Sequence, residues 1–177
     1  MEPHDSYEDR TKMAEMHYDV LERIEAAIKK KQAIEACWLC YSCFESRITR
    51  TLEKVSECCA GRKCYKNNRV GISRRIDCLK RLGKLSYMGL ENIDSKLLKR
   101  VQSWCKERNT MVHALVTLNN YYGMDGKFLK LAKEGKLLLE QLYSQTTEFR
   151  NRYYELNSIP EFPDGAHDKC KLNKKTP

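Results

Sequence analysis

One short stretch of the sequence combines side chains that could act on a phosphate group. It reads WCKERNTMVHALV from Trp104 to Val116, and it places Arg108, Asn109 and His113 in an otherwise apolar helical pattern. An arginine stays charged and stabilises negative charge on phosphoryl oxygens. A histidine exchanges protons near neutral pH. Arg108 and His113 are therefore candidate catalytic residues, and Asn109 could orient either His113 or the phosphate.

The position of Arg108 within its helix needs an explanation. At about 100° per residue, five apolar side chains lie within about 40° of Arg108 on a helical wheel. They are Leu97, Val101, Trp104, Val112 and Leu115. An unpaired guanidinium buried in such a stripe is costly. It needs a carboxylate partner, an exit to solvent along its aliphatic stem, or a cleft or subunit seam where it binds an anionic ligand.

Glu45 is the carboxylate that the sequence offers to Arg108. It falls in the apolar row of an earlier helical segment, where a hydrophobic residue would be expected. That row consists of Ile34, Trp38, Tyr41, Ile48 and Leu52. A structural Arg108–Glu45 pair is one reading and a catalytic arginine is another. The two are compatible if the glutamate orients the arginine, so Glu45 is a supporting candidate.

The spacing of Arg108, Asn109 and His113 resembles the signature of the HEPN superfamily, a group of all-α ribonucleases and related domains. In that family the motif, an arginine, a small polar residue, three further residues and a histidine, lies on a late helix of a bundle, as expected here. The resemblance covers roughly residues 7–157 at the level of the fold, and only the motif is specific. In some HEPN toxins a tyrosine two residues after the histidine is modified by the antitoxin. This chain has Leu115 there, which departs from that form of control.

The resemblance implies metal-independent RNA cleavage at a composite site in the seam of a homodimer, in a defence or toxin–antitoxin context. The RNA 2′-hydroxyl would attack the adjacent phosphodiester and leave a 2′,3′-cyclic phosphate. One histidine is too few for separate acid and base roles, so a symmetric dimer would supply a second His113. The partners expected are RNA, a second copy of the chain and an antitoxin or regulatory protein. No cofactor and no metal is expected.

The charge distribution also favours a polyanionic partner. The chain of 177 residues carries a formal net charge of +9. Basic residues gather between Ala60 and Lys84, where Asp77 is the only acid. The candidate RNA-binding residues of this segment are Arg62, Lys63, Lys66, Arg69, Arg74 and Arg75. Such a local excess creates a positive potential that suits a phosphate backbone, although a solvated face that binds nothing is the alternative.

The nine cysteines are interpreted mostly as reduced thiols within the core, because they follow helical apolar patterns. Cys37, Cys40 and Cys43 have part of the spacing of an iron–sulfur ligand run, but a fourth cysteine followed by proline is missing. The cysteines near residue 60 lack a pair of CxxC knuckles, which disfavours zinc. The polar, acidic N-terminal segment and the absence of a long apolar run predict a cytoplasmic protein without membrane contact.

The apolar periodicity predicts an all-α fold, an antiparallel bundle of about five helices. The expected helices span roughly 7–30, 32–57, 73–85, 94–118 and 125–157. The first two either run together or break near KKKQ, and Ser73 is the expected N-cap of the third. Gly135, in the apolar row of the last helix, predicts a close helix contact. Residues 1–157 are assigned to one HEPN-like domain and 158–177 to a basic, flexible tail.

Two other functions remain open from the sequence. The first is a non-catalytic HEPN-like module, in which Glu45 holds Arg108 and the basic segment binds nucleic acid or an acidic protein. The second is a structural protein that dimerises through the apolar stripe around Arg108. Cleavage of RNA separates the enzyme from both alternatives.

Overall fold

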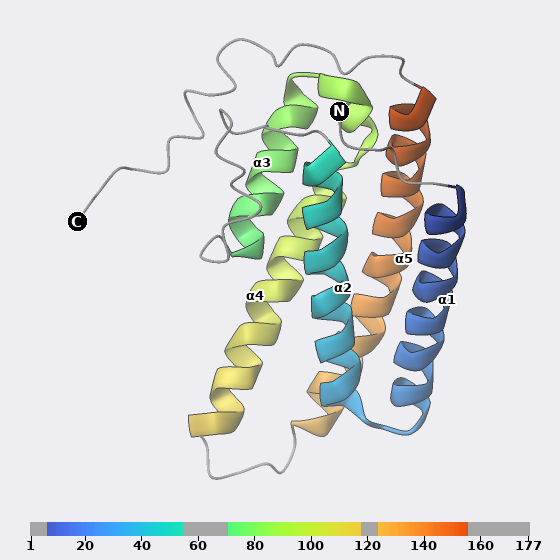
Figure 1. Cartoon of the computed structure of the whole chain (residues 1–177). Helices are drawn as coiled ribbons and strands as arrows, with labels where there is room; N and C mark the ends of the chain where they lie inside the picture. The colour runs from blue at the N-terminus through green and yellow to red at the C-terminus, as the bar shows by residue number, and fades with distance from the viewer. Residues whose placement is uncertain (1–6, 55–70, 118–123, 156–177) are drawn as a thin grey trace, which may run out of the picture.

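The computed structural model of the chain describes residues 7–54, 71–117 and 124–155, which form five α-helices and one 3₁₀ helix (Figure 1). The elements are α1 (Tyr7–Lys29), α2 (Ala33–Lys54), α3 (Ile72–Lys84), η2 (Tyr87–Asn92), α4 (Ser95–Thr117) and α5 (Asp125–Glu155). The predicted all-α class is confirmed. The basic segment from residue 55 to 70 and the predicted tail lie outside the described residues. No described helix is both long and apolar enough to cross a membrane.

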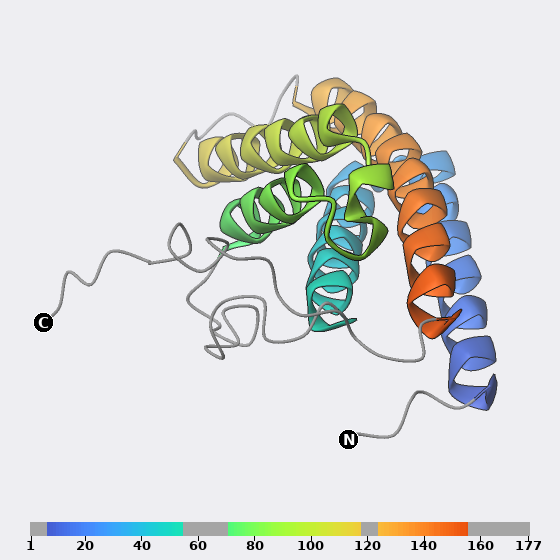
Figure 2. The ribbon, with the colours of Figure 1, turned by 90° about the horizontal axis from the view of Figure 1, so that it is seen from above.

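The helices form two groups. α1, α2 and α5 pack together, and the α3–α4 pair crosses them at a steep angle (Figure 2). The colour order in Figure 1 shows that α1 runs antiparallel to α2 and that α4 runs antiparallel to α5. It also shows that α2 and α5, which share an extensive interface, run in the same direction. The bundle is therefore of mixed direction rather than antiparallel throughout.

The helix boundaries follow local backbone chemistry. Lys31 adopts a left-handed conformation with φ of 59°, which ends α1 and separates it from α2 at the KKKQ sequence. The Asp94 side chain accepts a hydrogen bond from the backbone N–H of Lys96 at 2.8 Å, as an N-cap residue does. The expectation for α3 was wrong by two positions. Its N-cap is Gly71, which makes no side-chain cap, and Ser73 lies inside the helix.

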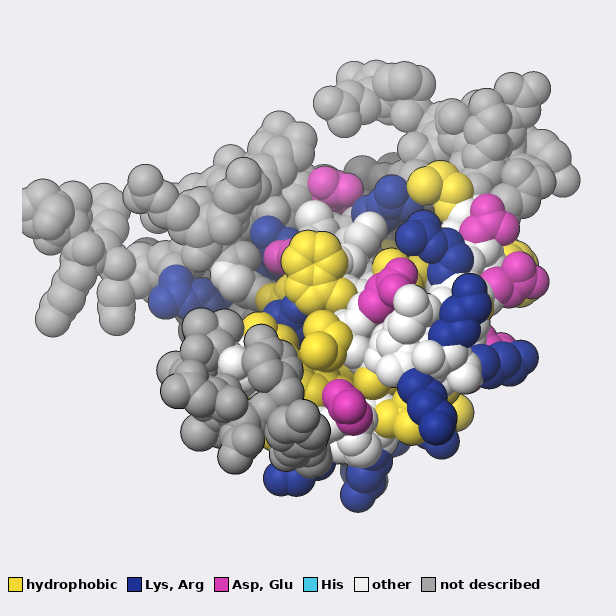
Figure 3. All heavy atoms as spheres, turned by 90° about the horizontal axis from the view of Figure 1, so that it is seen from below, with side chains coloured by type: hydrophobic (Ala, Val, Ile, Leu, Met, Phe, Trp, Pro, Cys, Tyr) yellow, Lys and Arg dark blue, Asp and Glu magenta, His cyan; other side chains and the backbone are white. Residues whose placement is uncertain are grey.

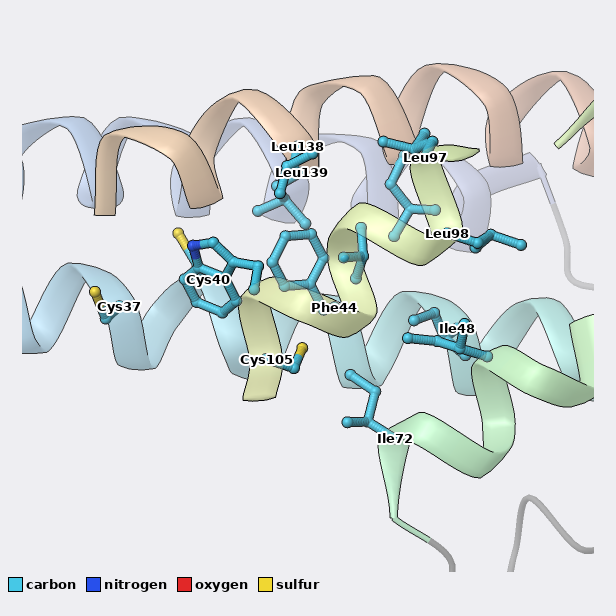
Figure 4. Packing of buried hydrophobic residues seen from close by; sticks show 14 of the residues in the cluster. Cys37, Cys40, Phe44, Ile48, Ile72, Leu97, Leu98, Cys105, Leu138 and Leu139 are labelled. Carbon is cyan, nitrogen blue, oxygen red and sulfur yellow. The ribbon is translucent and has the colours of Figure 1, made fainter. Parts of the chain in front are cut away.

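The core lies between the two helix groups, as Figure 4 shows for Phe44 of α2, Leu97 of α4 and Leu138 of α5. Trp104 of α4 is 2% exposed, and its Nε1 donates a hydrogen bond of 2.8 Å to the carbonyl oxygen of Leu131 on α5. The Trp104 ring meets Phe44 edge-on, with ring centroids 5.2 Å apart. Trp104 therefore ties α4 to both α2 and α5.

Gly135 allows α5 to approach this tryptophan, which confirms the predicted close contact. A Cβ atom at Gly135 would lie 2.6 Å from Cζ2 and 2.9 Å from Cε2 of Trp104. The indole cannot retreat easily, because its Nε1 is held by Leu131. The absence of a side chain at this position is therefore a requirement of packing, not of backbone conformation.

Replacing Gly135 with alanine should lower the free energy of unfolding by up to about 2 kcal/mol. Overpacking costs roughly 1–3 kcal/mol, and the gain of about 1 kcal/mol in helix propensity offsets part of it. Gly126→Ala is the matched control on the same helix, since a Cβ there meets nothing within 4 Å. We expect that control to be neutral or slightly stabilising in urea denaturation. Equal stability changes in the two variants would contradict the proposed clash.

Candidate functional site

The predicted apolar stripe of α4 has a buried N-terminal half and a partly buried C-terminal half. Leu97, Val101 and Trp104 are buried against the chain's own core. Val112 and Leu115, nearer the C-terminal end of the helix, are only partly buried and pack at the edge of that core. Arg108 lies between the two halves and is 9% exposed. A subunit seam along α4 would therefore involve its C-terminal half.

The partners of Arg108 are an aromatic ring and an amide. Its guanidinium carbon lies 4.8 Å from the ring centroid of Tyr41 on α2, a cation–π contact. Its Nη1 donates a hydrogen bond of 3.0 Å to the Oδ1 of Asn109. Its Nε is buried and has no hydrogen-bond partner among the residues that the structure describes. Neither partner carries a negative charge, so the positive charge of Arg108 is not neutralised by them.

Glu45 is bound to a different arginine. Its Oε1 lies 3.3 Å from Nη1 of Arg75 on α3, and the same nitrogen donates a 2.6 Å hydrogen bond to Thr49. The side chain of Arg75 is 8% exposed and that of Glu45 is 41% exposed. The Nε of Arg75, like that of Arg108, is buried and has no hydrogen-bond partner within the described parts of the chain. The Arg108–Glu45 pair considered from the sequence is thus replaced by an Arg75–Glu45 pair.

Tyr41 and Glu45 lie one helical turn apart on α2, and each contacts one of the two arginines. Burial raises the pKa of the Tyr41 phenol, and Glu45 adds to this, while Arg108 and Arg75 oppose it. We call Tyr41, Glu45, Arg75, Arg108 and Asn109 the α2–α4 cluster. Among its members two guanidinium groups face one carboxylate, so the cluster has an excess positive charge at neutral pH.

His113 lies apart from Arg108 along α4. It is exposed on α4. It comes five positions after Arg108, which turns it by roughly 140° and moves it about 7.5 Å along the axis. Asn109 shares its flank, but the Asn109 carbonyl oxygen is already bound to Arg108. The structure therefore brings Arg108 and Asn109 together, and it places His113 at an exposed position further along α4.

The candidate RNA-binding residues are only partly described. Arg74 is exposed on α3, whereas Arg75 is buried in the α2–α4 cluster and does not present its charge freely to solvent. The other four candidates, Arg62, Lys63, Lys66 and Arg69, lie outside the described residues.

The N-terminal turns of α2 carry the exposed side chains of Ile34 and Trp38, the latter 65% exposed. Figure 3, a view from below, shows hydrophobic side chains exposed among lysines and arginines.

The cysteines near this cluster behave as core residues. Among the described residues Cys37, Cys40, Cys78 and Cys105 are buried and in no disulfide, and Cys43 is partly buried. Burial raises the pKa of Cys37 and of Cys105 to about 12, against a smaller opposing effect of Arg108. Both thiols are therefore protonated at neutral pH and unsuited to nucleophilic attack. Within the described parts of the chain, no group of three His, Cys, Asp or Glu side chains could hold a metal ion.

The sequence did not single out Tyr41 as a partner of Arg108, nor Arg75 as a buried residue. The available signal for Tyr41 was its place in the same helical row as Glu45, one turn earlier. Arg75 gave no such signal, because it lay in a run of basic residues that suggested a solvated face.

Comparisons of the chain with protein-family models, with curated proteins and with solved structures found no match.

Proposed function

We propose that the protein is a metal-independent endoribonuclease that acts as a homodimer, in a defence or toxin–antitoxin context. The observation that carries this proposal is the excess positive charge of the α2–α4 cluster, next to the Arg108–Asn109–His113 spacing that resembles HEPN ribonucleases. Two arginines, each more than nine-tenths buried, lie there, and the one carboxylate of the cluster pairs with Arg75 and not with Arg108. A phosphate would supply the missing negative charge where solvent screens it weakly.

The chemistry needs an electrostatic group and two proton-transfer groups. The 2′-oxygen of RNA forms a bond to phosphorus while the bond from phosphorus to the 5′-oxygen breaks, leaving a 2′,3′-cyclic phosphate. One His113 accepts the proton of the 2′-hydroxyl, and a second His113 donates a proton to the departing 5′-oxygen. Arg108 stabilises the charge on the phosphoryl oxygens. Because each chain supplies a single His113 for these two roles, the second histidine is assigned to a partner copy.

The exposed residues near the cluster suit a single-stranded RNA. Trp38 lies one turn before Tyr41 on α2, and its open indole can stack on a base. Arg74, exposed on α3, can contact a backbone phosphate. We assign the dimer seam to the C-terminal half of α4, where Val112 and Leu115 are partly buried. These placements support cleavage of flexible RNA rather than of a duplex.

A non-catalytic binding module is the second candidate, and one observation favours it. Arg108 is held by Tyr41 and Asn109 and is only 9% exposed, which suits a structural role. In that case RNA or an acidic protein would bind through exposed basic residues such as Arg74. The affinity would fall steeply as the salt concentration rises, and no product would form.

The test is incubation of the purified protein with mixed single-stranded RNA in the presence of EDTA. We expect fragments that end in a 2′,3′-cyclic phosphate, and no cleavage of an RNA whose 2′-hydroxyls are methylated. Cleavage of the methylated RNA would contradict attack by the 2′-hydroxyl. Salt-dependent binding without any fragments would reject the enzyme and favour the binding module.

A further inference from the structure

One face of α4 carries a row of basic side chains that ends at His113. Lys99, Lys106 and His113 follow one another at intervals of seven residues, and all three are exposed. Seven residues make almost two full turns, so the three positions lie within about 40° of one another around the helix. Neighbouring members are about 10.5 Å apart along the axis. We call Lys99, Lys106 and His113 the α4 row.

The positive charge of the α4 row is not balanced by acids of the same helix. α4 contains five lysines and arginines, and Glu107 is its only acid. Glu107 lies about 100° from Lys106 around the helix, outside the row. Neither Lys99 nor Lys106 forms an ion pair with another described residue. The two lysines therefore present their charge to solvent rather than to a carboxylate of the described chain.

The first turn of α3 borders the α4 row. The Gln102 side chain of α4 donates a hydrogen bond of 3.3 Å from its Nε2 to the Ser73 carbonyl oxygen. Gln102 lies about 40° from Lys106 around the helix, so this contact is at the edge of the row. Arg74, which follows Ser73, is exposed. A further positive charge thus lies beside the row.

One acid of α3, Asp77, also lies beside the row, and it has a cation of its own. Its Oδ1 accepts a hydrogen bond of 3.2 Å from Gln102 and lies 3.5 Å from Nζ of Lys80. The Lys80 ammonium also donates a 2.6 Å hydrogen bond to the Gln102 carbonyl oxygen. Asp77 is therefore paired within α3 and does not neutralise the lysines of the row.

The row suits a nucleic-acid strand better than an acidic protein. Stable protein interfaces are built around a buried apolar centre. Among the described side chains of α4, no large hydrophobic one is exposed. A phosphate backbone needs no such centre, because charge alone supplies most of its affinity.

We propose that the α4 row binds the phosphate backbone of single-stranded RNA and leads the strand to His113. The proposal rests on the proposed function for the role of His113, but binding along the row does not require cleavage. A lysine ammonium is a compact charge on a flexible stem, so it contacts a phosphate without imposing one orientation. Phosphates distant from the cleaved bond would contact Lys99 and Lys106, and Arg74 would hold the strand from the α3 side.

The row runs beside the assigned dimer seam rather than through it. Val112, which belongs to the seam, lies about 100° from His113 around α4. It is partly buried, whereas the members of the row are exposed. A strand bound along the row would therefore leave the seam free for the partner copy.

The test is binding of 2′-O-methylated single-stranded RNA, which the proposed reaction cannot cleave, over a range of salt concentrations. Each phosphate contact contributes about 0.7 to the slope of log affinity against log salt concentration. We expect the double variant Lys99→Gln/Lys106→Gln to reduce the magnitude of this slope by about 1.4. The matched control, Lys130→Gln/Lys133→Gln, removes two exposed lysines of α5, in the other helix group (Figure 2), and should change the slope by less than about 0.3.

Three results of this experiment would overturn the proposal. They are equal slope changes in the two double variants, the absence of RNA binding by the wild type, and displacement of the RNA by polyglutamate of equal charge. The last result would assign the row to an acidic protein instead.

A second measurement separates the row from the chemistry. Lys99 lies about 21 Å from His113 along α4, so a dinucleotide with one phosphate cannot reach both. Lys99→Gln should lower kcat/KM about fivefold at 0.1 M salt for a long RNA and leave it unchanged for the dinucleotide. Equal losses for both substrates would mean that the substitution acts through the fold, and the row would be wrong.

The two proposals can fail separately. If the wild type binds methylated RNA with the expected slope change but cleaves no RNA, the row stands and the enzyme is wrong. If it cleaves RNA while both double variants bind with the same slope, the enzyme stands and the row is wrong.

Discussion

An alanine at His113 should lower RNA cleavage at least about 100-fold while leaving the protein as stable as the wild type. Positioned general acid–base groups contribute roughly 10²–10⁴-fold to a reaction rate. His113 is exposed, so its removal creates no cavity in the core. The rate would be measured with single-stranded RNA in EDTA, and stability by thermal unfolding. Ser103→Ala, at another exposed position of α4, is the control and should retain full activity.

The same variant tests whether the site is shared between two copies. Random mixing of equal amounts of wild type and His113→Ala would leave about a quarter of the dimers with both histidines. If both are needed, the mixture should show about half of the activity that the same amount of wild-type protein shows by itself. If the mixture instead keeps the full activity of the wild-type protein that it contains, one histidine suffices and the proposed dimer site is wrong. Loss of activity in Ser103→Ala would instead indicate damage to the helix.

The fold was predictable where local chemistry determines it. Long apolar periods and few glycines were enough to predict all five α-helices to within a few residues, but left open whether the first two run together or break near KKKQ. The start of α3 was missed because Ser73 is a strong N-cap residue type, yet Gly71 precedes the first turn. The parallel direction of α2 and α5 depends on the route of the chain between them. Apolar spacing contains no information about that route.

The candidate site was predictable as a set of residue types but not as a set of contacts. The sequence identified Arg108 as a charged residue that needs a partner, and Glu45 as an acidic residue in an apolar helical row. The way in which α3 and α4 cross α2 determines the arginine that pairs with Glu45. In the structure that arginine is Arg75. Cation–π contacts leave no sequence pattern of their own, so the role of Tyr41 became visible only in the packed structure.

Replacing Trp104 with alanine should have the largest effect on stability, a loss of about 3–5 kcal/mol in the free energy of unfolding. The indole fills the space between α4, α2 and α5, and its loss also leaves the Leu131 carbonyl without the Nε1 donor. Urea denaturation followed by circular dichroism measures the change. Leu137→Ala is a suitable control, because this α5 leucine is 57% exposed and should cost well under 1 kcal/mol.

The close contact between Gly135 and Trp104 also predicts that their substitutions are not additive. Gly135→Ala is destabilising because its new Cβ meets the indole, so the clash disappears once Trp104 is alanine. In the double variant the methyl group would instead occupy part of the cavity and retain its gain in helix propensity. We expect the double variant to be more stable than Trp104→Ala alone, with a coupling energy of about 1–3 kcal/mol. Additive losses would mean that α5 shifts to accommodate the methyl group, and Gly135 would then not be what fixes the distance between α4 and α5.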